Sequence, residues 1–252
     1  MTLTLIILAS FLSGLGGLLL AFALLRGRLW SHDRSHYFLS FAAGTLLAVA
    51  FLDLLPESFE AFEAAGASGI QTGALAVLIG FLVFFSIEKL ILWYHCHEEH
   101  CEVHTSSAMV LIGDTLHNFL DGVAIAVSFM VSPAVGIATT VAVFFHEIPQ
   151  EVADFTVLLN SGMKPARAIA YNLLSALSSL VGAVAAYFFS TTVNGLAPIL
   201  IAVTTGGFIY IAASDLVPEI HKERRRAQMT RQLGVFLLGA FVIYVITRYA
   251  PA

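Results

Sequence analysis

The sequence predicts an all-α integral membrane protein with eight transmembrane helices. Of its 252 residues, 58% are hydrophobic and only 12% are charged, whereas soluble domains carry about 25% charged residues. The apolar runs are about 20 residues long and do not alternate with polar residues, which favours helices over barrel strands. We therefore expect one transmembrane domain over 1–252, with the lipid bilayer as its surroundings and no nucleic-acid partner.

Each predicted helix follows from one apolar run. The runs occupy roughly 3–25, 37–56, 70–94, 107–131, 134–159, 166–190, 195–217 and 232–250. The first run has no Lys or Arg before it and is too long for the apolar part of a signal peptide, so we interpret it as a span.

Basic residues are distributed unequally between the two ends of these spans. Eleven of the twelve Lys and Arg residues lie in or near the connections after spans 1, 3, 5 and 7, and Arg248 lies toward the opposite side. Cytoplasmic connections carry the excess of positive charge, so we expect both termini to face outward. Because no long outer domain precedes the first span, we expect a prokaryotic cytoplasmic membrane.

One sequence pattern occurs twice. Residues 44–57 read GTLLAVAFLDLLPE and residues 206–219 read GGFIYIAASDLVPE, at a constant offset of 162. By the span count these segments lie in spans 2 and 7, which cross the membrane in opposite directions. We therefore predict a 3+2+3 inverted-repeat architecture around spans 4 and 5, and such repeats are typical of transporters.

Two polar motifs interrupt the apolar runs of spans 4 and 5. HNFLD occupies residues 117–121 and HEIPQE occupies residues 146–151. Around a helix, Asp121 lies about 40° and Asn118 about 100° from His117, so the three share one face. The second motif repeats these angles with His146, Gln150 and Glu147, and Glu151 follows at about 140°. Ionisable groups in the core of a bilayer cost roughly 3 kcal/mol each. Their presence in two spans therefore favours a polar site that handles a cation.

The residue types of the two motifs predict two adjacent metal positions between spans 4 and 5. His117, His146 and Asp121 favour the first position. Asn118, Glu147 and Glu151 favour the second, with Asp121 placed to bridge the two. Mixed nitrogen and oxygen ligands suit Zn²⁺, Fe²⁺, Mn²⁺ or Cd²⁺ better than Mg²⁺ or Ca²⁺. The structural alternative is a buried polar network that joins two helices, for which a single amide or hydroxyl would serve.

Further polar residues lie outside the central motifs. Asp53, Asp215 and Glu219 lie near span ends, where they either mark a cation pathway or cap helices at the interface. Asn172 in span 6 is a weaker candidate for the second position. The connection at 95–106 predicts a loose cytoplasmic metal-binding tract or, alternatively, a solvated polar loop. Its candidate ligands are His95, Cys96, His97, His100, Cys101 and His104.

The motif pair resembles that of the ZIP (zinc/iron-regulated transporter-like) family. HNFLDG in span 4 and HEIPQEVADF in span 5 are similar to the paired motifs of that family, and the second is close to the HEXPHEXGD form of one subfamily. The resemblance covers nearly the whole chain. It implies a homodimeric transporter that moves zinc-like ions into the cytoplasm by an elevator motion. The ligands implied by the resemblance are His117, Asn118, Asp121, His146, Glu147, Gln150 and Glu151.

Two residues depart from the subfamily pattern. Gln150 stands in place of His, and Ala153 stands in place of Gly. Because an amide is a poorer ligand than imidazole, we expect a weaker first metal position or a selectivity broader than zinc. An intramembrane protease would need HExxH, which Gln150 also breaks, so we expect no enzyme. A secondary transporter or a channel for another cation is the alternative function.

Overall fold

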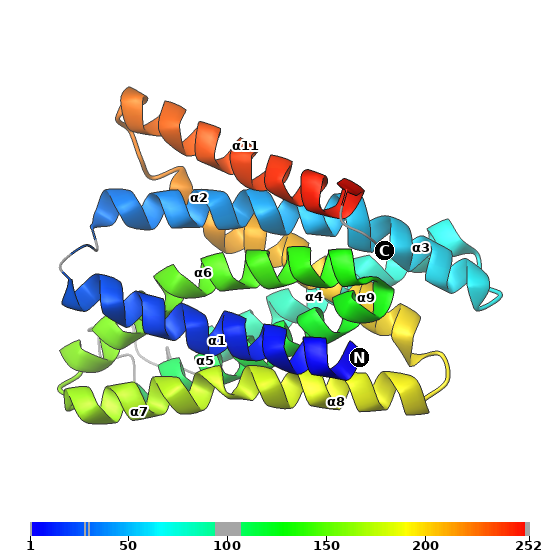
Figure 1. Ribbon diagram of the computed structural model, residues 1–252, viewed down its shortest axis with the longest axis horizontal. Helices are drawn as coiled ribbons and strands as arrows, with labels where there is room; N and C mark the ends of the chain where they lie inside the picture. Colours follow the sequence, from blue (N-terminus) through cyan, green and yellow to red (C-terminus); the bar gives the residue numbers. More distant parts are fainter. Residues whose placement is uncertain (1, 28, 30, 94–106, 250–252) are drawn as a thin grey trace.

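The computed structural model describes residues 2–27, 29, 31–93 and 107–249, and in these ranges every regular element is a helix. Five helices are continuous: α1 (Thr2–Arg26), α4 (Gly69–Trp93), α5 (Ser107–Val131), α6 (Pro133–Asn160) and α11 (Arg226–Tyr249). Figure 1 shows that they run roughly along the long axis of the molecule. The all-helical class predicted from composition is confirmed.

The other helical rods are built from consecutive pieces. The second rod joins α2 (His32–Ala48), the π-helical segment η1 (Val49–Leu54) and α3 (Leu55–Ala64). The sixth joins α7 (Pro165–Ala176) and α8 (Ser178–Thr192), which are separated at Leu177. The seventh joins α9 (Leu196–Tyr210), the π-helical segment η2 (Ile211–Leu216) and α10 (Val217–Ile220). A rod therefore occupies each of the eight ranges predicted from the apolar runs.

Seven helical stretches of the described chain are long and apolar enough to cross a membrane. The rod missing from these seven is α6, which carries the polar motif of residues 146–151. Polar and charged residues lower the mean hydropathy of α6, so hydropathy alone does not single it out, although its apolar run at 134–159 is visible in the sequence. The eight-span count stays a prediction, with which these helices are consistent.

A tight turn joins α5 to α6. Ser132 caps α6 by accepting a hydrogen bond from the Val135 amide at 3.2 Å, and Pro133 occupies the first helical position, where its missing N–H costs nothing. His117 lies near the middle of α5 and His146 near the middle of α6, at nearly equal separations from the turn. Each lies about 20 Å from the turn along its helix axis, so the hairpin brings the two histidines to the same depth.

The two π-helical segments occupy equivalent positions in the sequence repeat. Residues 49–54 and 211–216 are related by the same offset of 162. The amide of Leu55 donates to the Ala50 carbonyl, and the amide of Val217 donates to the Ala212 carbonyl, five residues back in both cases. A π turn of this kind is rare and occurs often at functional sites. The shared irregularity is consistent with the predicted inverted repeat.

Glycines let repeat-related helices approach closely. A Cβ atom on Gly44 of α2 would lie 2.0 Å from the Phe236 carbonyl oxygen of α11. A Cβ atom on Gly206 of α9 would lie 2.2 Å from the Val77 carbonyl oxygen of α4. Gly44 and Gly206 are paired by the offset of 162. The close contact between α2 (span 2) and α11 (span 8) therefore has a counterpart in the contact between α9 (span 7) and α4 (span 3). Small residues at such crossings are how membrane helices pack without a hydrophobic driving force.

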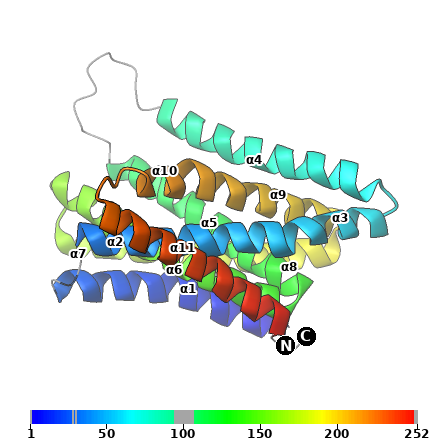
Figure 2. The same ribbon diagram turned by 90° about the horizontal axis from the view of Figure 1, so that it is seen from above.

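The hairpin of α5 and α6 lies at the centre of the helix packing. α5 packs against α6, α8 and α1, while α6 also packs against α1 and α2. Figure 2 shows α4 on the opposite side of the molecule from α1, with the remaining helices between them. The motifs on α5 and α6 are therefore enclosed by neighbouring helices.

Candidate metal centre

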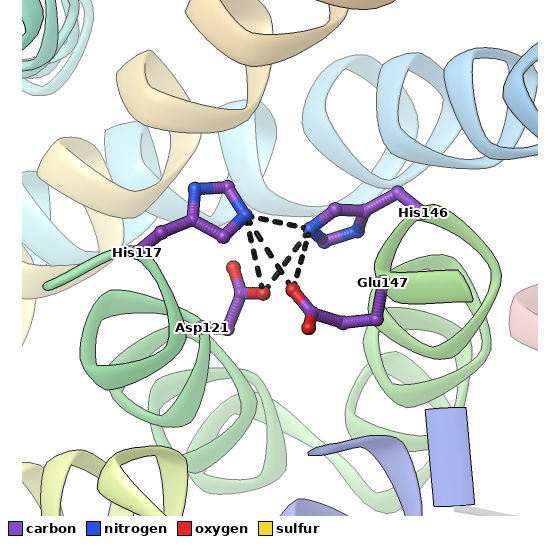
Figure 3. Close-up of side chains that lie close together, drawn as sticks. All are labelled: His117, Asp121, His146 and Glu147. Carbon is purple, nitrogen blue, oxygen red and sulfur yellow. Dashed lines mark hydrogen bonds and ion pairs between the residues drawn. The ribbon is translucent and has the colours of Figure 1, made fainter. Parts of the chain in front are cut away.

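Four side chains of α5 and α6 form a compact group, which we name the four-ligand cluster: His117, Asp121, His146 and Glu147. Each offers one ligand atom, and the four atoms all lie within 4.8 Å of one another. Figure 3 shows both imidazoles and both carboxylates turned toward a common centre, with two residues contributed by each helix.

The spacing of these atoms fits a tetrahedral ion. The His117 Nε2 atom lies 3.0 Å from His146 Nε2, 3.7 Å from Asp121 Oδ2 and 3.6 Å from Glu147 Oε1. The His146 Nε2 atom lies 3.1 Å from Asp121 Oδ2 and 3.5 Å from Glu147 Oε1. Ligand atoms bound about 2.0 to 2.1 Å from a tetrahedral zinc ion are about 3.3 Å apart. These five separations, from 3.0 to 3.7 Å, bracket that value.

The carboxylates of the four-ligand cluster are deeply buried. The side chains of Asp121 and Glu147 are 3% and 0% exposed, whereas that of His117 is 21% exposed. Neither Asp121 Oδ2 nor either oxygen of Glu147 has a hydrogen-bond partner within the described residues. A buried carboxylate without such partners costs several kcal/mol. A divalent cation at the centre would compensate both charges.

A backbone contact orients the His146 ring. Its Nδ1 atom lies 3.2 Å from the carbonyl oxygen of Ala142, one turn earlier in α6. Because a carbonyl only accepts hydrogen bonds, Nδ1 is the atom that carries the proton in the neutral ring. The lone pair of Nε2 is then directed at the centre of the cluster, which is the usual arrangement of a metal-binding histidine.

Glu147, predicted as a ligand of the second metal position, also lies close to both histidines of the first. Its residue type favours the second metal position, but its Oε1 lies 3.6 Å and 3.5 Å from the two histidines of the first. The reason is the rotation of α6 about its axis, which turns Glu147 as well as His146 toward α5. Asp121, predicted to bridge the two positions, lies in the four-ligand cluster through Oδ2.

A second polar group, which we name the Asp114 cluster, consists of Asp114, Asn118 and Gln150. Asp114 Oδ1 accepts hydrogen bonds from Asn118 Nδ2 at 2.9 Å and from Gln150 Nε2 at 3.4 Å. Asp114 is absent from the predicted ligands, although its position four residues before Asn118 places it on the same helix face. The four-residue spacing from Asp114 to Asn118 was therefore the feature of the sequence from which Asp114 could have been found.

Two more predicted site residues are buried without hydrogen-bond partners. Glu151 on α6 is 1% exposed and Asn172 on α7 is 0% exposed. Both carboxylate oxygens of Glu151 and both amide atoms of Asn172 lack a partner among the described residues. They lie outside the four-ligand cluster. Their unpaired atoms keep both residues as candidates for the second position.

The remaining candidates lie elsewhere. Asp53 belongs to η1 and is partly buried, whereas Asp215 belongs to η2 and is exposed. Glu219 forms an ion pair with Lys222, as expected for a residue at a membrane interface. The six predicted loop ligands, His95, Cys96, His97, His100, Cys101 and His104, lie outside the described residues.

A small cavity of about 30 Å³ adjoins Asp121. It lies among α4, α5, α9 and η2, with Phe84 and Phe208 among its lining residues. Asp121 and Thr204 are the polar residues of this lining. A space of about 10 to 15 Å³ accommodates one water molecule, so the cavity can hold about two beside the cluster.

Comparison with known proteins identifies the family of this chain. The chain matches the family described as ZIP zinc transporter over residues 1–107 and 94–247. This chain belongs to the ZIP family. Zinc transporter ZIP13 of Pongo abelii is 34% identical over 220 residues, which are 84% of this chain and 66% of that protein. Zinc transporter ZIP10 of Danio rerio is 42% identical over 137 residues, which are 53% of this chain and 16% of that protein.

A further ZIP relative agrees with these two. Zinc transporter foi of Drosophila melanogaster is 38% identical over 142 residues, which are 56% of this chain and 20% of that protein. This ZIP chain thus spans 66% of the length of ZIP13 and 20% or less of the other two.

Membership of the ZIP family confirms the resemblance inferred from HNFLDG and HEIPQEVADF. The family is one of transporters rather than enzymes, as expected from the sequence. The family and the apolar helices together show an integral membrane protein. The relatives named above are animal proteins and give no support to the expected prokaryotic membrane.

Proposed function

We propose that this ZIP protein transports a zinc-like divalent cation across the membrane into the cytoplasm, through a binuclear site between α5 and α6. The observation that carries the proposal is the four-ligand cluster, in which two imidazole nitrogens and two carboxylate oxygens gather within 4.8 Å. The names of the matched proteins, all zinc transporters, support zinc as the substrate.

The two metal positions differ in their ligands. The four-ligand cluster forms the first position, where nitrogen and oxygen ligands favour Zn²⁺ and also admit Cd²⁺, Fe²⁺ or Mn²⁺. Asn118, Gln150 and Glu151 form the second, with Asn172 as a further candidate. The ion exchanges its water ligands for these side chains, so that a charge that would be unstable in lipid is neutralised at the site.

The direction of transport rests on the charge distribution. Lys164, Lys222 and Arg224 lie in the turns after α6 and α10, and Arg167 lies in the first turn of α7. Figure 1 shows these turns at one end of the bundle and both chain termini at the other. The positive-inside rule makes the basic end cytoplasmic. Asp53 and Asp215, one on each π-helical segment, are proposed as residues of the cation pathway.

The elevator motion is proposed for one helix group relative to another. Within the first group α1 packs on α6 and α5 packs on α8; within the second α2 packs on α11 and α4 packs on α9. The first group carries both polar motifs. The homodimer implied by the resemblance is part of the same proposal, and cross-linking of the protein in membranes tests it.

Uptake by proteoliposomes tests the proposed function. We expect the wild-type protein to take up Zn²⁺ with saturable kinetics, and the double variant His117→Ala/His146→Ala to fall to the level of empty vesicles. His221→Ala is the matched control, because it removes an exposed histidine outside the cluster. Equal uptake by the wild type and the double variant would refute the proposal. Flux that rises in proportion to the gradient without saturation would instead indicate a channel.

A further inference from the structure

The Asp114 cluster has a hydrogen-bond arrangement that fixes the orientation of two amide groups. Asp114 is 4% exposed, and its Oδ1 atom accepts from both Asn118 Nδ2 and Gln150 Nε2. Its Oδ2 atom has no partner in the part of the chain that the structure describes. One oxygen of Asp114 therefore connects α5 to α6 beside the four-ligand cluster.

The chemistry of the groups decides which end of each amide faces Asp114. A carboxylate oxygen accepts hydrogen bonds, so the NH₂ end of each amide must point to it. The carbonyl oxygen is then directed away from Asp114. In Asn118 this Oδ1 atom is buried and has no hydrogen-bond partner within the described ranges. An amide binds a cation through this oxygen, because its nitrogen has no available lone pair.

We propose that Asp114 is a positioning residue that holds the amides of Asn118 and Gln150 with their carbonyl oxygens free to bind a second cation. The proposal rests on the proposed function, because it concerns the second of the two metal positions. Asp114 itself is not a ligand in this arrangement. Its Oδ1 atom accepts two hydrogen bonds, and its backbone carbonyl accepts a further, longer one from Asn118 Nδ2 at 3.2 Å.

The consequence is a difference in metal preference between the two positions. The first position contains two imidazole nitrogens, which suit Zn²⁺. The proposed ligands of the second are the carbonyl oxygens of Asn118 and Gln150 and the carboxylate of Glu151; Asn118 Oδ1 and both Glu151 oxygens have no hydrogen-bond partner among the described residues. Oxygen ligands suit harder cations such as Mn²⁺. The second position therefore selects Mn²⁺-like cations, and Gln150 is the residue that removes nitrogen from it.

Two substitutions at Asp114 separate positioning from charge. Asp114→Leu removes the hydrogen-bond acceptor. Asp114→Asn keeps an oxygen acceptor but removes the negative charge, and two NH₂ donors facing it select the oxygen end of the new amide. The measurement is Mn²⁺ binding to the purified full-length protein by electron paramagnetic resonance, with Zn²⁺ already bound at the first position.

We expect Asp114→Leu to weaken Mn²⁺ binding by about 10- to 100-fold, the range typical for loss of a partner that orients a metal ligand. Asp114→Asn should bind Mn²⁺ at least tenfold more tightly than Asp114→Leu. Asp114→Ala replaces the leucine variant where leucine prevents folding. Mn²⁺ binding that is unchanged in the leucine or alanine variant overturns the proposal, as does equal loss in the asparagine variant.

Zinc binding in the same samples separates this proposal from the proposed function. The four-ligand cluster contains none of the substituted atoms, so every Asp114 variant should bind Zn²⁺ at the first position with wild-type stoichiometry. Anomalous scattering at the zinc edge places that ion. If zinc is absent from the four-ligand cluster of the wild-type protein, the proposed function fails; if only the Mn²⁺ pattern differs, the role of Asp114 fails.

Discussion

The four-ligand cluster and the Asp114 cluster lie on the same two helices but satisfy their polar atoms in opposite ways. In the four-ligand cluster, Asp121 Oδ2 and both Glu147 oxygens have no hydrogen-bond partner within the described chain. In the Asp114 cluster, one carboxylate oxygen accepts from two amides. The first arrangement leaves these carboxylate oxygens without hydrogen-bond donors, so that they can bind a cation. The second uses its carboxylate to arrange neutral ligands.

This contrast follows from the residue types that each carboxylate meets. Asp121 and Glu147 face imidazole nitrogens, which present lone pairs to a cation, so carboxylates and rings can share one ion. Asp114 faces amide NH₂ groups, which are donors and occupy its oxygen directly. Burial of an acid therefore does not by itself identify a ligand. The hydrogen-bond capacity of its neighbours determines its role.

The greatest change is expected from the imidazoles of the four-ligand cluster. His146→Ala removes a ligand that the Ala142 carbonyl already orients. We expect zinc affinity to fall by about 100-fold or more, since loss of an orienting partner alone costs about 10- to 100-fold. Isothermal titration of the purified protein measures the change, with His221→Ala as the control. A loss below threefold would show that His146 is not a ligand.

Exchange of Gln150 for histidine should make the two clusters more alike. Gln150→His introduces a nitrogen ligand into a position that is otherwise formed by oxygen. We expect the ratio of Zn²⁺ to Mn²⁺ affinity at the second position to rise about tenfold, equivalent to about 1.4 kcal/mol. Competition between the two metals in uptake and in binding measures the ratio. An unchanged ratio would mean that residue 150 does not contact the second ion.

A smaller change, in stability, is expected from neutralising an uncompensated carboxylate. Glu147→Gln keeps the size of the side chain but removes a charge that is 0% exposed. We expect the metal-free variant to be more stable by about 1 kcal/mol, because breaking or removing buried charges changes stability on this scale.

The same variant should also be stabilised less by zinc than the wild type. A ligand that binds the folded state raises the unfolding temperature, and Glu147→Gln should reduce this zinc-dependent rise. Thermal unfolding in detergent, with and without zinc, measures both quantities. If Glu147→Gln is less stable than the wild type without metal, and zinc stabilises both proteins equally, then Glu147 is not a buried carboxylate that awaits a cation.

The slightest change is expected from an acid outside the membrane spans. Glu223 accepts hydrogen bonds from the Arg225 guanidinium and from the Arg224 and Arg225 amides. The Arg225 contacts come first among the causes that lower the pKa of Glu223 to about 2 from its usual value of 4.5. A lowered pKa means that the stabilisation is present above about pH 4.5 and is lost as pH falls through about 2.

Glu223→Gln therefore serves as a remote control for both clusters. We expect unchanged Zn²⁺ and Mn²⁺ binding at pH 7, and a slight loss of thermal stability that diminishes below about pH 4.5. Unfolding scans of wild type and variant at pH 7, 5 and 3 test the trend. A change in metal binding would show that the turn between α10 and α11 and the metal centre are coupled.

The helical class and the places of the rods could be predicted from the amino-acid sequence, and so could the nearly equal separations of His117 and His146 from the turn between α5 and α6. Apolar runs of about 20 residues in lipid permit helices, and the short turn at Ser132 and Pro133 makes α5 and α6 antiparallel. His117 and His146 then reach the same depth because they are nearly equidistant from that turn. These features depend on local propensity and on chain connectivity, which can both be inferred from the order of residues along the chain.

Which atoms meet was settled only by tertiary packing. Glu147 joins the histidines, and Asp114 becomes the acceptor for Asn118 and Gln150, because α5 and α6 are rotated about their axes to particular angles. Those angles are set by α1, α2 and α8, which pack on the hairpin from distant parts of the chain. The π-helical winding of η1 and η2 was likewise not predicted from the sequence, although both segments lie within the repeated sequence pattern. The rotation of a helix about its axis depends on non-local packing. The periodicity of residues within that one helix does not determine it.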